Sequence, residues 1–97
     1  MLSENPSDAF LSFLRSSLER YGIEKIFSKS NQFFNATTKL PPGLIMLSID
    51  GDFEVLIDNI ALYSGMDALD ALYMFGLAAR VFDVECGGKH LNRIIKY

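Results

Sequence analysis

The sequence contains no tryptophan, one cysteine, one histidine and three prolines among its 97 residues. A single cysteine excludes a disulfide within the chain, and Cys86 with His90 supplies only two of the four ligands that a closed zinc site requires. We expect no metal site and no cofactor. The first six residues lack the apolar run of a signal peptide, and no segment is apolar enough over about 20 residues to span a bilayer. We therefore expect an intracellular protein without a membrane partner.

Basic residues are nearly absent from the middle of the chain. Between Thr38 and Arg80 the only base is Lys39, whereas the acids of this stretch are Asp50, Asp52, Glu54, Asp58, Asp67 and Asp70. The net charge is −3, yet the last nine residues carry no acid and three bases, namely Lys89, Arg93 and Lys96. Nucleic acid needs a broad positive field, so a nucleic-acid partner is possible but not favoured.

The chain is rich in apolar side chains. Hydrophobic residues make up 49% of the sequence, and eight phenylalanines and four tyrosines supply bulky core material. At this length we expect one domain, residues 1–97, which can bury a core without disulfides or metal.

The most apolar stretch predicts a long helix at about residues 65–82. Ser64 is the expected cap, with Asp67 as an acid in the first turn. The helix is apolar nearly all round, which is typical of a helix buried on more than one side. Gly76 forms a patch of small residues with Ala71, Ala78 and Ala79. This patch indicates close approach by the N-terminal helix or, as the less favoured alternative, by a second copy of the chain.

The N-terminal third is predicted to be helical. Residues 5–21 carry an amphipathic stripe that begins at Asn5 as cap and ends at Gly22. A shorter helix is expected over residues 23–29, followed by an irregular passage, although Phe33 and Phe34 could equally begin a strand. The triplet at residues 35–37 matches a glycosylation acceptor, which means little without a secretory signal.

A three-stranded antiparallel meander is predicted for about residues 44–63. Asp50-Gly51 and Asp58-Asn59 are two-residue turns that separate strands at 44–49, 52–57 and 60–63. After the long helix, Gly87-Gly88 is expected to be a flexible break, and residues 89–97 a short amphipathic helix or a tail. The predicted class is α+β.

Residues 53–97 also resemble a known type of module. The run Phe53–Gly65, then Ala68–Phe75 with its Ala-Leu-x-x-Leu-x-x-Phe pattern, then Val81–Glu85, is similar to the C-terminal module of uncharacterised, apparently mobile-element-derived eukaryotic proteins. The chain departs from that pattern at Cys86-Gly87-Gly88, where the module has an aromatic residue followed by proline. The resemblance implies an architecture and no catalytic residues.

No group of residues indicates an enzyme. A thiol beside an imidazole can act as a nucleophile, but Cys86 and His90 lack an orienting third group and an oxyanion site. The stretch from Asp50 to Glu54 has its glycine in the wrong place for a calcium loop. Asp67 and Asp70 form a carboxylate pair on one helix, and Asp67 is already explained as an N-terminal charge.

We therefore expect a non-enzymatic module that self-associates or binds a protein partner through an apolar helix surface. The candidate residues of that surface are Asp70, Tyr73, Gly76, Leu77 and Arg80. One alternative is a nucleic-acid-associated accessory protein that uses the basic tail, Lys89, Arg93 and Lys96. Another is a small acidic inhibitor that occupies a basic site on its target with Asp50, Asp52 and Glu54.

Overall fold

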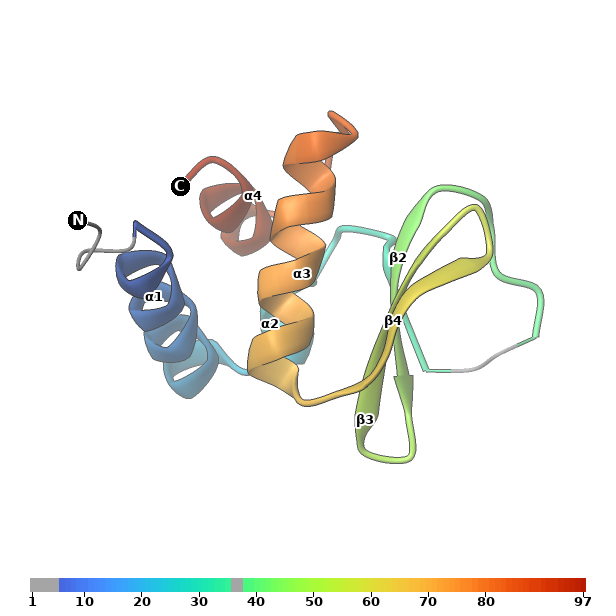
Figure 1. Cartoon of the computed structure of the whole chain (residues 1–97), viewed down its shortest axis with the longest axis horizontal. Coiled ribbons are helices and arrows are strands. Elements are labelled where there is room, and N and C mark those ends of the chain that lie inside the picture. The colour runs from blue at the N-terminus through green and yellow to red at the C-terminus, as the bar shows by residue number, and fades with distance from the viewer. Residues whose placement is uncertain (1–5, 36–37) are drawn as a thin grey trace.

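The computed structural model describes residues 6–35 and 38–97 (Figure 1). The predicted cap Asn5 therefore lies outside the described residues, as does most of the acceptor triplet at 35–37. The described chain is α+β, with four helices and a four-stranded mixed sheet. The elements in order are α1 Pro6–Tyr21, α2 Ile23–Ile26, β1 Phe33–Phe34, β2 Leu44–Ile49, β3 Asp52–Ile57, β4 Ile60–Met66, α3 Ala68–Val81 and α4 Lys89–Ile95.

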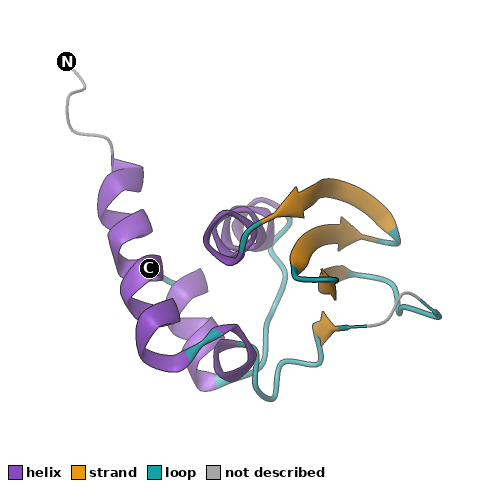
Figure 2. Ribbon diagram, turned by 90° about the horizontal axis from the view of Figure 1, so that it is seen from below, coloured by secondary structure: helices purple, strands orange, loops and turns teal. Residues whose placement is uncertain are grey.

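Helix α3 lies between the other helices and the sheet. Both views show α1 and α4 on one side of α3 and the strands on the other (Figures 1 and 2). Its buried residues occupy one broad face of the helix and are Ala71, Leu72, Phe75, Gly76, Ala78 and Ala79. A helix buried on several sides was expected from its apolar circumference.

The small-residue patch of α3 packs within the chain. Gly76 is buried, and a Cβ atom placed there would lie 3.4 Å from Phe10 Cζ of α1 and 3.9 Å from Ile94 Cγ2 of α4. Phe75 is fully buried, and its ring meets that of Phe27 edge-on at 4.9 Å. At Gly76 the close approach is therefore made by α1 and α4 of the same chain, which is the favoured alternative.

The start of α3 differs from the prediction. The cap is Asp67, whose carboxylate accepts a hydrogen bond of 2.8 Å from the Asp70 N–H. Ser64 belongs to β4, and its hydroxyl donates to the Glu54 carboxylate at 2.7 Å. The strand extends to Met66 because cross-strand pairing continues there opposite Phe53. A carboxylate directly before the helix caps as well as a serine does, and the sequence offered both.

The meander is confirmed as β2–β3–β4, and both predicted turns have the left-handed backbone that they require. The φ angles are 48° at Asp50, 88° at Gly51, 51° at Asp58 and 67° at Asn59. These values fit type I′ turns, in which both central residues have positive φ.

The passage expected to be irregular contains a strand. Strand β1 pairs in parallel with β2, with Phe33 opposite Met46. The Met46 N–H donates to the Gln32 carbonyl at 2.8 Å, and the Gln32 side-chain amide donates to the Leu44 carbonyl at 3.3 Å. Helix α2 is also shorter than predicted and ends at Ile26. The partner of β1 lies more than ten residues away, so local propensity did not reveal the pairing.

Strand β4 is an edge strand with two irregularities. It places seven residues beside the five of Phe53–Ile57, with register shifts between Phe53 and Val55 and between Val55 and Leu56. Extra residues of this kind bend and twist an edge strand and protect it from pairing with other strands.

The C-terminal residues form helix α4, which is held against α3 by an arginine. Arg80 donates to the carbonyls of Ile94 and Ile95 at 3.0 Å each, and its guanidinium lies 4.4 Å from the centre of the Phe10 ring. Gly87 and Gly88, predicted to be a flexible break, instead pass close to the α2 turn. A Cβ atom at Gly87 would come within 2.6 Å of the Lys29 carbonyl oxygen.

We predict that Gly76→Ala stabilises the protein by about 0.5–1 kcal/mol, because glycine inside a helix costs that much relative to alanine and the new methyl meets Phe10 at an ordinary contact distance. Gly76→Leu should lower stability by about 1–3 kcal/mol through overpacking. Urea unfolding measures both variants. A large loss of stability in the alanine variant would contradict this packing.

We predict that Asp67→Ala lowers the free energy of unfolding by about 1 kcal/mol, because it removes the N-cap of α3. Ser64→Ala removes only an exposed hydrogen bond and should cost less. Thermal unfolding followed by circular dichroism compares the two variants. A larger loss of stability in Ser64→Ala than in Asp67→Ala would indicate that Ser64 is the cap.

Candidate functional site

The five residues predicted as a partner surface do not form one surface. Tyr73 packs on the Phe10 ring at 5.6 Å, Gly76 is buried, and Arg80 is bonded to α4. Leu77 instead lies on the side of α3 that faces β4. Asp70 is exposed in the first turn. Because α1 and α4 cover the Gly76 side of α3, only Leu77 among the five lines an open apolar surface.

The two predicted charged groups are each brought together. Asp50, Asp52 and Glu54 line a shallow hollow at the β2–β3 turn. Arg93 and Lys96 border a hollow beside Phe13 and Tyr97, and Lys89 lies at the start of the same short helix.

Cys86 and His90 have different neighbours. The Cys86 thiol is buried and lies 3.9 Å from the Val84 carbonyl, and burial raises its pKa, an effect that a hydrogen bond with Gln32 offsets in part. The His90 ring packs against Tyr21 of α1 at 4.1 Å. Among residues 6–35 and 38–97, no three histidine, cysteine or acidic residues are grouped as metal ligands would be.

An apolar groove lies between α3 and β4, with a volume of about 410 Å³. We call it the α3–β4 groove. Its lining is entirely uncharged and consists of Leu62, Tyr63, Met74, Leu77, Ala78, Val81 and Phe82. Val81 is 75% exposed, Phe82 51%, Tyr63 46% and Leu62 37%.

Local structure explains why these side chains meet. Consecutive side chains of a regular strand point to opposite faces, but the register shift between Val55 and Leu56 inserts one extra residue in β4. Leu62 and Tyr63 therefore both line the groove. On α3, Met74, Leu77, Ala78 and Val81 recur at three and four residues and share one face.

The described chain exposes six large hydrophobic residues, and four of them line this groove. The other two are Ile60, at the start of β4, and Tyr97. Exposed apolar surface gathered in one place is typical of an interaction site. In the described ranges no helix combines the length and the apolar character needed to cross a membrane.

Comparisons with protein-family models, with curated proteins and with solved structures found no match. The resemblance of residues 53–97 therefore stays a prediction.

Of the groove residues, only Leu77 was predicted from the sequence as part of a partner surface. Val81 and Phe82 were not among the predicted surface residues, because a helix that is apolar nearly all round does not mark which of its residues stay exposed. The available signal was the position of Val81 as the last residue of α3 and of Phe82 as its C-cap. The placement of Leu62 and Tyr63 in the groove depends on the irregularity in β4. Gly65 is the only residue of this strand whose type indicates such an irregularity.

We predict that Cys86 reacts slowly in the folded protein. The thiolate is the reactive form, and a raised pKa lowers its fraction at any given pH below that pKa. At pH 8 the alkylation rate with iodoacetamide should rise clearly when urea unfolds the chain, while free glutathione serves as the reference thiol. Equal rates for folded and unfolded protein would indicate an accessible Cys86.

Proposed function

We propose that this protein is a non-enzymatic interaction module that binds a protein partner in the α3–β4 groove. The observation that carries the proposal is the gathering there of Leu62, Tyr63, Val81 and Phe82, all exposed. Complete burial of one such side chain contributes about 1.5–3 kcal/mol. A partner that covers the two most exposed side chains, Val81 and Phe82, would gain a substantial part of a micromolar affinity.

The charge around the groove favours a partner of another kind over a second copy. Residues 31–88 carry eight acids and two bases, and exposed acids adjoin the groove in sequence at Asp58, beside the start of β4, and at Asp83, directly after Phe82. Figure 1 shows the β3–β4 turn and the C-terminal end of α3 in the same half of the molecule. Two copies that met here would bring like charges together. We therefore assign the groove to a peptide segment with an apolar centre and lysine or arginine at its flanks.

The surroundings of Asp67 and Cys86 argue against a catalytic role for either residue. The Asp67 carboxylate accepts a hydrogen bond from the Asp70 N–H, so a structural role as helix cap accounts for this residue. Cys86 is buried with a raised pKa, which is the opposite of an activated nucleophile.

The test uses a displayed library of random peptides as the probe. Selection on the wild-type protein should enrich sequences with two or three apolar residues flanked by lysine or arginine. Val81→Asp should weaken binding of the enriched peptides at least about tenfold, because it places a charge in the apolar groove. Affinity is measured by fluorescence anisotropy at two salt concentrations, and the basic flanks predict weaker binding at higher salt.

Ser12→Asp is the matched control, because it adds the same charge at an exposed position on α1. It should bind as the wild type does, and circular dichroism checks that both variants fold. Peptides that bind Val81→Asp as well as wild type would sink the proposal. A mass that doubles with concentration in light scattering, and returns to one chain in Val81→Asp, would assign the groove to a second copy instead.

A further inference from the structure

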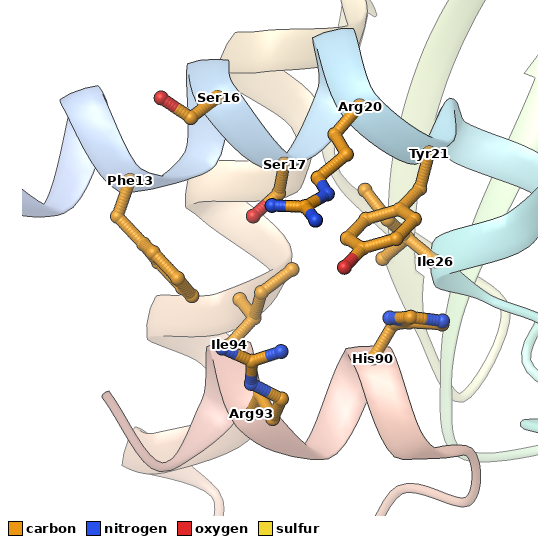
Figure 3. A pocket seen from close by; sticks show the side chains of 9 residues that line it. All are labelled: Phe13, Ser16, Ser17, Arg20, Tyr21, Ile26, His90, Arg93 and Ile94. Carbon is orange, nitrogen blue, oxygen red and sulfur yellow. The ribbon is translucent and has the colours of Figure 1, made fainter.

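A second hollow lies between α1 and α4, on the other side of α3 from the groove (Figure 3). We call it the α1–α4 pocket. It has a volume of about 210 Å³ and an apolar part formed by Phe13, Ile26 and Ile94. Its polar lining is Ser16, Ser17, Arg20, Tyr21, His90 and Arg93. A cavity needs only about 10–15 Å³ of such space to hold one water, so several ligand atoms fit.

Helical spacing aims these side chains at one place. On α1 the lining residues fall at 13, 16, 17, 20 and 21, and on α4 they fall at 90, 93 and 94. Residues three and four apart lie on the same face of a helix. The two facing stripes therefore build the pocket, and neither stripe is notable alone.

The pocket is positive and has no acid in its lining. Figure 3 shows the guanidinium groups of Arg20 and Arg93 extending from opposite helices into the space between them, with the Ser17 hydroxyl beside Arg20 and the Tyr21 hydroxyl turned toward α4. Arginine offers a planar fork of N–H donors that matches the oxygens of phosphate. Hydroxyl groups supply further donors for the same oxygens.

His90 adds a polar atom without a partner. Its Nδ1 is buried, and the described residues provide no hydrogen bond to it. A buried polar group without a hydrogen bond costs free energy. The His90 ring packs against the Tyr21 ring at a centroid distance of 4.1 Å. Partial burial and the nearby charges of Lys25, Lys89 and Arg93 lower the pKa of His90. The positive surroundings that disfavour its protonation would attract an anion.

We propose that the α1–α4 pocket binds a phosphate group, either free phosphate or the phosphate of a small monoester, through Arg20, Arg93 and the hydroxyls of Ser17 and Tyr21, with the His90 ring at its border. The apolar side chains of Phe13, Ile26 and Ile94 would contact the carbon atoms of a monoester. This proposal is independent of the α3–β4 groove and uses none of its residues.

The test titrates the full chain with inorganic phosphate and, separately, with methyl phosphate, by calorimetry at constant ionic strength. We expect saturable binding of one anion per chain, while acetate at the same concentration has little effect. Tighter binding of methyl phosphate assigns the pocket to a monoester, and tighter binding of inorganic phosphate assigns it to the free ion. No saturable binding of either anion would overturn the proposal.

Arg20→Gln and Arg93→Gln should each weaken binding about tenfold or more, which is the loss of one charge-assisted hydrogen bond. Arg15→Gln is the matched control, because Arg15 is an exposed arginine of the same helix outside the pocket. It should change affinity less than about twofold. Arg20→Lys keeps the positive charge but removes the planar fork of guanidinium N–H donors. This variant should still fold, and it should bind the anion several-fold more weakly than the wild type does. Equal losses of anion affinity in Arg15→Gln and Arg20→Gln would indicate general charge attraction and would overturn the proposed binding site.

Sulfate, whose charge does not change between pH 5 and 8, tests the part assigned to His90. The charged and titratable groups around His90 are Arg20 and Tyr21 of α1, Lys25 of α2, and Lys89 and Arg93 of α4. Sulfate affinity should rise as the pH falls through the lowered pKa of His90, and His90→Gln should flatten the profile. A flat profile in the wild type would remove His90 from the site.

Discussion

The ring of Phe75 lies at the middle of α3, fully buried, and forms a T-shaped contact with the Phe27 ring. Its neighbours on the helix are small or apolar in nearly every direction, so no single layer can cover α3. The meander covers one side, α1 a second and α4 a third. Arg80 closes this arrangement by joining the last turn of α4 to α3 and by lying over the Phe10 ring.

The groove lies where this covering of α3 is incomplete, whereas the pocket lies between two of the helices that cover it. The groove lies beside the irregular register of β4, where Val81 at the end of α3 and its C-cap Phe82 are exposed. The pocket lies between α1 and α4, and Arg20 and Arg93 line it from opposite helices. One site is apolar with acids nearby and the other is basic, and α3 separates them.

Much of the fold was predictable, because its signals are local. The amphipathic stripe of α1, the apolar circumference of α3 and the turn residues Asp50-Gly51 and Asp58-Asn59 each determine structure within a few residues. Strand β1 was not predictable with certainty, since its ladder depends on β2. The choice of Asp67 over Ser64 as cap depends on where β4 stops pairing. The two candidate sites could largely not be predicted from the sequence, because each combines segments that lie far apart in it, such as Leu62 with Phe82 and Arg20 with Arg93.

The uneven distribution of charge has a consequence for how the molecule meets others. Residues 6–30 and 89–97, which form the helices on one side of α3, carry seven bases and three acids, whereas the sheet and α3 lie in the acidic stretch 31–88. Separated charge of this kind is a permanent electric dipole. In the field of a charged surface the molecule rotates before contact, so its productive orientation is selected during diffusion. Salt would shorten the range of that rotation. Although the net charge is only −3, the side formed by the basic helices attracts anions and the side formed by the sheet and α3 attracts cations.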